Sequence, residues 1–143
     1  MAEASPPSVR LEFLLAADIE SVYGAWTDEA VLRQWFGPSE GIEAEVELDL
    51  RIGGRYRITM GSRTTRGEYL EITPPRRLSF TWTWDDEPEV ETRVTIELEP
   101  EGEHTRMVLE HEQLPLEVDC MGFEMGWRRS IAKLERHFSA RTS

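Results

Sequence analysis

The feature that most constrains this fold is the regular alternation of apolar and polar side chains along most of the chain. In one segment Leu78, Phe80, Trp82 and Trp84 alternate with serine and threonine, a period of two that predicts a strand with one buried face. Similar alternation predicts strands in segments 9–15, 44–48, 56–60, 78–84, 94–98 and 107–109. Turn-forming residues separate several of these segments, as in Glu-Gly-Glu at 101–103, so the strands are expected to form an antiparallel meander.

The C-terminal quarter of the chain has a different period. Its large apolar side chains recur at steps of three and four, which predicts one amphipathic helix of about 20 residues, roughly 30 Å long. They are Phe123, Trp127, Ile131, Leu134 and Phe138. Pro115 precedes them and suits the first turn of such a helix. The apolar face of the predicted sheet is the one large surface against which this helix can pack.

Two short helices are expected between the first and second strands. Asp18 fits the N-cap of the first helix, and Thr27 or Asp28 fits the N-cap of the second. Gly37-Pro38 then ends the second helix, because glycine adopts a left-handed exit and proline cannot continue a helix.

These patterns predict an α+β fold. It has a curved antiparallel sheet of about six to seven strands, two short helices after the first strand, and a long C-terminal helix across the sheet. Residues 1–8 are expected to be a flexible lead, 9–139 a single domain and 140–143 a tail. A helix laid across a curved sheet leaves room at one end, which is a physical route to a cavity.

Charge and cysteine content restrict the partners and the compartment. The 143 residues carry a formal net charge of −12, which disfavours binding to nucleic acid and to anionic membrane surfaces. The single cysteine, Cys120, cannot form an internal disulfide and favours a reducing compartment. The first residues do not resemble a signal peptide and no segment has the length of a membrane span. A cytoplasmic location without stable membrane insertion is expected.

Several short motifs occur in an order that resembles one protein family. They are Trp26-Thr27-Asp28, Trp35-Phe36-Gly37-Pro38, Asp49-Leu50-Arg51-Ile52-Gly53-Gly54-Arg55-Tyr56, Gly67-Glu68-Tyr69-Leu70-Glu71-Ile72, Pro74-Pro75-Arg76-Arg77-Leu78, Thr81-Trp82-Thr83-Trp84 and Gly126-Trp127. In this order they resemble the bacterial homologues of the activator of the 90-kDa heat-shock protein ATPase, within the START-like, Bet-v-1-like (SRPBCC) helix-grip superfamily. The resemblance spans about residues 8–138. It implies a helix-grip fold with a hydrophobic cavity, and superfamily relatives include lipid-transfer domains and polyketide cyclases.

Candidate cavity walls are the aromatic, methionine and histidine side chains that the pattern places on the inner strand faces and near the last helix. They are Trp26, Trp35, Phe36, Tyr56, Met60, Tyr69, Trp82, Trp84, His111, Met121, Phe123, Met125 and Trp127. Packing in the core is the competing interpretation for each of them. Gly122 and Gly126 either make room for a ligand or let the helix approach the sheet closely. Many family members have histidine where this chain has Phe123, so the resemblance implies a more apolar wall here.

No motif identifies a catalytic, metal or cofactor site. The three histidines have no metal-ligand spacing, and nothing resembles a catalytic triad or a dinucleotide-binding loop. The sequence therefore predicts no catalytic residue, no metal and no cofactor, and leaves open whether the protein is an enzyme.

Three functions stay open, and binding of a small apolar or aromatic ligand leads. The first alternative is a cyclase- or hydratase-like enzyme on such a ligand, which would draw on polar side chains. They are Asp49, Arg51, Tyr56, Tyr69, Glu71 and His111. The second alternative is a chaperone-associated interaction domain. A homodimer is compatible with all three.

Overall fold

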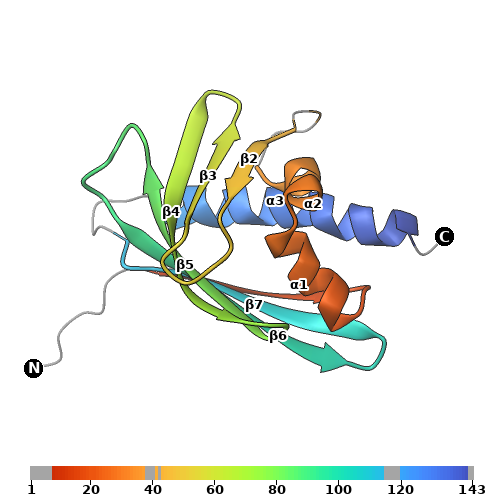
Figure 1. The fold of residues 1–143 in the computed structure, drawn as a ribbon. Helices are drawn as coiled ribbons and strands as arrows, with labels where there is room; N and C mark the ends of the chain where they lie inside the picture. Colours follow the sequence, from red (N-terminus) through yellow and green to blue (C-terminus); the bar gives the residue numbers. More distant parts are fainter. Residues whose placement is uncertain (1–7, 38–40, 42, 115–119, 142–143) are drawn as a thin grey trace, which may run out of the picture.

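The computed structural model describes residues 8–37, 41, 43–114 and 120–141. Seven strands and three helices follow one another along the chain (Figure 1). They are β1 (Val9–Leu15), α1 (Ile19–Thr27), α2 (Glu29–Trp35), β2 (Glu45–Leu48), β3 (Arg55–Met60), β4 (Arg63–Thr73), β5 (Arg77–Trp84), β6 (Thr92–Glu101), β7 (His104–Glu112) and α3 (Cys120–Arg141).

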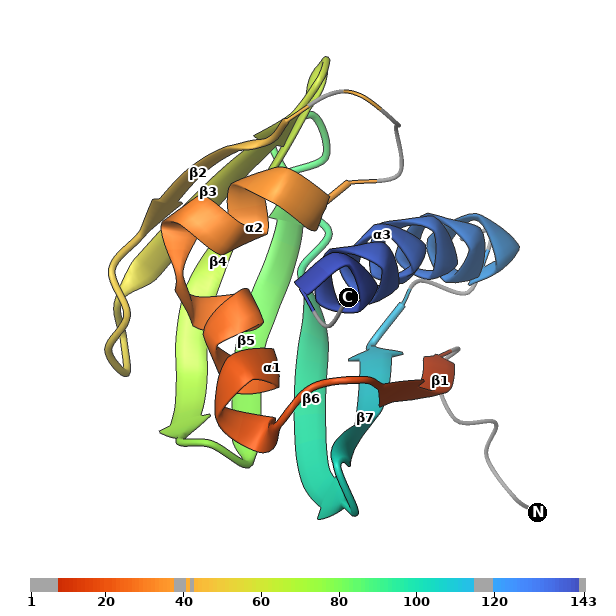
Figure 2. The ribbon, with the colours of Figure 1, turned by 90° about the vertical axis from the view of Figure 1, so that its right-hand side faces the viewer.

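The strands form one antiparallel sheet in the order β1-β7-β6-β5-β4-β3-β2. Strands β2 to β7 are a meander, and β1 joins its far edge by pairing with β7. The sheet is strongly curved, and all three helices lie on its concave side, with α3 crossing it (Figure 2). The predicted α+β helix-grip fold is confirmed.

The core lies between the concave sheet face and the apolar stripe of α3. On β5 the side chains of Leu78, Phe80 and Trp82 are buried, as the period of two predicted. On α3 the side chains of Trp127, Ile131, Leu134 and Phe138 are all buried, as the helical period predicted. Burial of these large apolar groups is the main term that holds the helix on the sheet.

The short helices begin and end at the predicted residues. Asp28 is the N-cap of α2, and its carboxylate accepts a hydrogen bond from the backbone N–H of Ala30 at 2.9 Å. Asp18 is the N-cap residue of α1, but its carboxylate accepts from the hydroxyl of Ser21 rather than from the backbone. Helix α2 ends at Trp35, and Gly37 follows with φ of 103°.

The sequence placed Pro115 at the start of the last helix and residue 139 at the end of the domain. Pro115 lies outside the described residues, and the described part of α3 begins at Cys120. The helix has 22 residues and extends to Arg141, two residues past the expected domain end. Most of the expected lead lies outside the described residues, and residues 142 and 143 of the expected tail do too. None of the described helices combines the length and the hydropathy needed to span a membrane.

The backbone pairing between β4 and β5 is interrupted in the middle of the sheet. Arg66 pairs with Thr83 and Tyr69 pairs with Phe80, whereas Gly67 and Glu68 between them have no partner on β5, and the register shifts between Tyr69 and Glu71. The hydroxyl of Tyr56, from β3, donates instead to the carbonyl oxygen of Thr81 at 2.5 Å. Glu68 N–H donates to the Thr81 hydroxyl at 2.9 Å. The side chains of Tyr56 and Thr81 therefore make the hydrogen bonds that the backbone does not make where the pairing of β4 and β5 is interrupted.

Candidate functional site

A groove of about 350 Å³ opens between the N-terminal half of α3 and the end of the sheet. Its lining comes from the exit of α2, the β3–β4 hairpin, the end of β5 and one face of α3. The lining residues are Phe36, Met60, Ser62, Arg63, Trp82, Trp84, Gly122, Phe123, Gly126, Trp127 and Ser130. The α3 members recur at steps of three and four, so one helical face forms one whole wall.

Five of the eleven lining residues of the groove are aromatic. The Trp82 ring lies 5.3 Å from Trp127, 5.2 Å from Trp84 and 6.0 Å from Phe36, measured between centroids. Phe36 and Trp127 meet edge to face at 5.6 Å. These distances fall in the range of favourable ring contacts, so the wall is a packed cluster that joins α2, β5 and α3.

A chain of buried hydrogen bonds fixes two of these tryptophans. Trp127 Nε1–H donates to His111 Nδ1 at 3.1 Å. An indole nitrogen can only donate, so Nδ1 is unprotonated and the imidazole proton is on Nε2. Nε2 donates this proton to the Thr92 hydroxyl oxygen, which lies 2.8 Å from it. The Thr92 hydroxyl in turn donates to the carbonyl oxygen of Trp82 at 3.0 Å. The order of donors is therefore Trp127, His111, Thr92 and the Trp82 carbonyl.

Burial controls the charge of His111. The imidazole is fully buried, and it lies 4.6 Å from the Phe123 ring and 5.4 Å from the Trp82 ring. Desolvation lowers the pKa of His111 from 6.5 to about 3. The residue is thus a neutral structural link behind the groove at physiological pH.

Ser130 ties the exit of α2 to α3 at the bottom of the groove. Its hydroxyl accepts from the backbone N–H of Gly37 at 3.2 Å and donates to the carbonyl of Gly126 at 3.0 Å. The backbone of Gly37 approaches Met60 closely, because a Cβ at Gly37 would lie 3.1 Å from Met60 Cγ. These contacts hold Phe36, the residue between α2 and Gly37, against the aromatic cluster.

One lining residue of the groove, Arg63, is positively charged. The Arg63 guanidinium lies 3.8 Å above the Trp84 ring, a cation–π contact. The same group pairs with Asp86 at 2.9 Å and with Glu87 at 3.4 Å. The two carboxylates therefore neutralise the charge of Arg63.

Comparison with protein families identifies the chain. A family model described as "Activator of Hsp90 ATPase homolog 1-like protein" matches residues 16–139. The chain belongs to this family. The groove and its aromatic cluster lie within the matched region. No curated protein matched the sequence.

Solved structures of similar proteins include members of the same family. The AHSA1 protein SPO3351 from Silicibacter pomeroyi is 29% identical with a TM-score of 0.79, over 94% of this chain and 99% of that one. Protein CV1439 from Chromobacterium violaceum is 28% identical with a TM-score of 0.79, over 92% and 96%. PFC0360w, an HSP90 activator from Plasmodium falciparum, is 30% identical with a TM-score of 0.63, over 76% and 74%.

Six of the thirteen residues expected to line a cavity lie in the groove wall of this AHSA1-family protein. They are Phe36, Met60, Trp82, Trp84, Phe123 and Trp127. Gly122 and Gly126 also line it, which agrees with the interpretation that these glycines make room. His111 lies behind the wall rather than in it, with both ring nitrogens engaged.

Four other expected wall residues pack deeper in the core. Trp26 and Trp35 are buried and meet edge to face at 4.8 Å. Trp26, Tyr56 and Tyr69 surround an inner void of only about 10 Å³, at the lower limit for a single water molecule. The inner part of the expected cavity is therefore filled by side chains, and the groove lies at the α3 end.

Met121 and Met125 do not line the groove. Their side chains are 68% and 46% exposed. Each lies two positions from Phe123, which is about 200° around a helix, so both turn away from the wall that Phe123 helps to form. Their expected placement in the wall is wrong for this geometric reason.

Three groove residues were not predicted from the sequence: Ser62, Arg63 and Ser130. Ser62 and Arg63 fall in a turn and at a strand start, where alternation carries no signal. Ser130 could have been found, because it lies three positions after Trp127 and so interrupts the apolar face of α3 with a hydroxyl.

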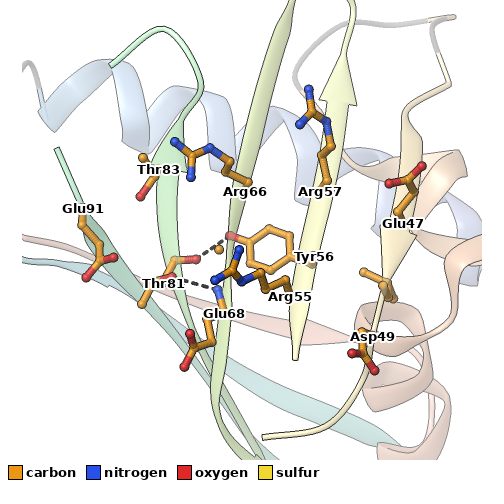
Figure 3. A pocket seen from close by; sticks show the side chains of 12 residues that line it. Glu47, Asp49, Arg55, Tyr56, Arg57, Arg66, Glu68, Thr81, Thr83 and Glu91 are labelled. Atoms are coloured by element: carbon orange, nitrogen blue, oxygen red, sulfur yellow. Dashed lines mark hydrogen bonds between the residues drawn. The ribbon is translucent and has the colours of Figure 1, made fainter. Parts of the chain in front are cut away.

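A second cavity, of about 570 Å³, lies on the sheet face that points away from α3 (Figure 3). Its walls are charged, and the charges compensate one another. Arg57 and Arg66 both pair with Asp85, at 2.9 and 2.7 Å, and Arg55 stands opposite Glu68 in the register. This cavity is larger than the groove, but most of its lining residues are charged or polar, so the groove is the better candidate for an organic ligand.

Among the polar residues that an enzyme could use, Tyr56 and Tyr69 lie together with ring centroids 5.7 Å apart, but the charged ones pair elsewhere. Asp49 and Arg51 form an exposed pair with each other at 2.9 Å, and Glu71 pairs with Arg77 at 2.8 Å. Burial raises the pKa of both Tyr56 and Tyr69, which keeps the phenols protonated. Among the described residues no group of three histidine, cysteine or carboxylate side chains could hold a metal ion.

Proposed function

We propose that this protein binds a small, largely apolar or aromatic molecule in the groove between α3 and the end of the sheet. The observation that carries the proposal is the groove itself. Its volume of about 350 Å³ lies in the range of small-molecule sites, about 300–1,000 Å³. Aromatic rings from both the sheet and the helix line it, and such walls favour planar apolar ligands.

Binding without catalysis fits the polar groups better than an enzymatic role does. A general acid or base has to reach the ligand, and the candidate groups are paired with one another or buried away from the groove. His111, the nearest of them, has both nitrogens in hydrogen bonds. The single cysteine supports a reducing compartment such as the cytoplasm as the place of action.

Gly126 offers a direct test. This residue lines the groove, and a Cβ built on it would meet nothing within 4 Å. Gly126→Leu therefore places a side chain in the groove with no clash at its Cβ, and replacing a helical glycine favours the helix by up to about 1 kcal/mol. We expect Gly126→Leu to fold but to lose at least about tenfold in affinity for 2-acetylnaphthalene, measured by isothermal titration calorimetry.

Gly24→Leu is the matched control. Gly24 is also a helical glycine with nothing within 4 Å of an added Cβ, and it is not part of the groove. The control should bind like the wild type. Equal affinity of wild type and Gly126→Leu would contradict the groove as the site. Native mass spectrometry of protein from its own host, followed by extraction, then identifies the natural ligand.

A role with a chaperone is the second candidate, supported by the 30% identity to an HSP90 activator. For this role, filling the groove by Gly126→Leu should leave the activity unchanged. Stimulation of the ATPase of a 90-kDa heat-shock protein by wild type and by Gly126→Leu alike would favour the chaperone role over the ligand role.

A further inference from the structure

The hydrogen-bond partners of the buried tryptophans show one exception. Each of the four buried indoles carries an N–H that can only donate. Trp26 donates to the sulfur of Met107 at 3.3 Å, Trp35 to the carbonyl of Ala25 at 3.0 Å, and Trp127 to His111 at 3.1 Å. Trp82 Nε1 has no acceptor among the described residues.

The one buried tryptophan whose N–H lacks an acceptor among the described residues, Trp82, belongs to the groove lining. Trp82 is only 5% exposed, and its ring is part of the groove wall. A buried donor without an acceptor costs free energy, and native structures satisfy most such groups with protein, water or ligand. The Tyr23 hydroxyl and Arg93 Nε also lack partners among the described residues, but neither residue lines the groove.

We propose that Trp82 determines ligand specificity by donating its indole N–H to a neutral oxygen acceptor, such as a carbonyl, on a planar aromatic ligand in the groove. This inference rests on the proposed function and narrows its ligand class. The other groove indole with a buried N–H, Trp127, is not available for this role because His111 already accepts its proton.

The charges around the groove favour a neutral acceptor over an anion. Arg63 is the one charged side chain among the described lining residues. Its guanidinium is held between the Trp84 ring and the carboxylates of Asp86 and Glu87. A carboxylate ligand would have to displace those two acids inside a molecule of net charge −12, whereas a carbonyl meets no such repulsion.

Ring geometry favours a planar ligand. Three rings of the groove lining, those of Phe36, Trp82 and Trp127, are nearly buried and pack against one another with centroids 5.3 to 6.0 Å apart. A flat ring system can pack against such faces in offset or edge-on contact. Because Trp82 Nε1 is buried, a lining side chain has to shift before the ligand's substituent can accept a hydrogen bond from this N–H.

Three naphthalenes that differ in one substituent test the inference: 2-acetylnaphthalene, 2-ethylnaphthalene and 2-naphthoate. In calorimetric titrations the wild type should bind the ketone about five- to tenfold more tightly than the hydrocarbon, since one hydrogen bond is gained. The naphthoate should bind more weakly than the ketone. Trp82→Phe removes the N–H but keeps a ring, and should bind the ketone and the hydrocarbon with equal affinity. Trp26→Phe removes an indole N–H outside the groove, so it is the control and should keep the preference.

Nuclear magnetic resonance of the wild-type protein provides a measurement that does not depend on a variant folding. The indole ¹H–¹⁵N signal of Trp82 should move downfield on addition of the ketone and not on addition of the hydrocarbon. Binding of both ligands with equal affinity and an unmoved Trp82 signal would overturn the inference and leave the proposed function standing. Tighter binding of the naphthoate would overturn the preference for a neutral acceptor. Failure of all three to bind would overturn both proposals.

Discussion

His111 shows how neighbouring residues decide the chemistry of one side chain. Its nitrogens contact Thr92 and Trp127, which lie 19 and 16 positions away in the sequence. The sequence predicted that His111 faces the cavity region, but no local pattern could reveal these two partners. With one proton and two fixed partners, the imidazole joins β6, β7 and α3 and orients the groove wall.

Protonation of His111 should destabilise the fold. Its pKa of about 3 in the folded protein lies below the ordinary value of 6.5, so the unfolded chain takes up a proton first as the pH falls. The free energy of unfolding should be constant above pH 6.5 and should decrease between pH 6.5 and pH 3. At about 1.36 kcal/mol per pH unit, His111 accounts for about 2 to 3 kcal/mol between pH 6.5 and pH 4.5. Urea unfolding followed by circular dichroism measures this change.

His111→Gln separates this effect from other acid-sensitive groups. An amide can accept from Trp127 and donate to Thr92 but does not titrate, so this variant should lose most of the slope between pH 6.5 and pH 4.5. His104→Gln, at an exposed position on the other end of β7, should keep the wild-type slope. An unchanged slope in His111→Gln would show that His111 is not the titrating group.

At the scale of secondary-structure elements, the interrupted pairing between β4 and β5 is the least predictable feature of the sheet. Strand β4 has a glycine, Gly67, where an alternating strand would have a side chain, so no regular alternation marks it in the sequence. The Tyr56 ring lies where a side chain of residue 67 would project, and its hydroxyl donates to the carbonyl oxygen of Thr81 in the gap in the pairing. The position of the gap depends on three strands at once, which no single segment of sequence encodes.

Gly67→Ala should disrupt this arrangement. A Cβ at residue 67 would lie 2.0 Å from the carbonyl oxygen of Thr81 and 2.7 Å from the Tyr56 ring, so backbone has to move. We expect a loss of about 3 kcal/mol in the free energy of unfolding, at the upper end of overpacking effects. Gly24→Ala, where nothing lies within 4 Å, should instead be neutral or stabilising by up to about 1 kcal/mol. Equal stability of the two variants in urea would contradict the tight approach of Thr81 to Gly67.

At the scale of the whole molecule, the sequence predicted the architecture better than the site. The strand meander, the helix caps and the apolar stripe of α3 are local patterns, and the structure confirms them. The division of aromatic residues between core and groove is not local. Trp26 and Trp82 have the same chemistry in the sequence, but Trp26 on α1 packs among rings from α2, β5 and α3, while Trp82 lies at the groove wall.

Occupancy of the groove should stabilise the entire domain, because a ligand that binds only the folded state raises its free energy of unfolding. At a free ligand concentration of 100 times Kd, the gain is about 2.7 kcal/mol. For a domain of this size that corresponds to a rise in Tm of about 6–10 °C. Differential scanning calorimetry with 2-acetylnaphthalene should show this rise for Gly24→Leu and no rise for Gly126→Leu. A rise in both would place the ligand outside the groove.

The aromatic cluster also determines how this protein interacts with light. All five tryptophans belong to one series of ring contacts. From Trp35 through Trp26, Trp127 and Trp82 to Trp84, successive centroids lie 4.8, 5.9, 5.3 and 5.2 Å apart. Indoles this close exchange excitation far faster than they emit, so the ultraviolet fluorescence of the whole chain comes from one coupled chromophore. A quencher that touches a single ring of the groove darkens all five.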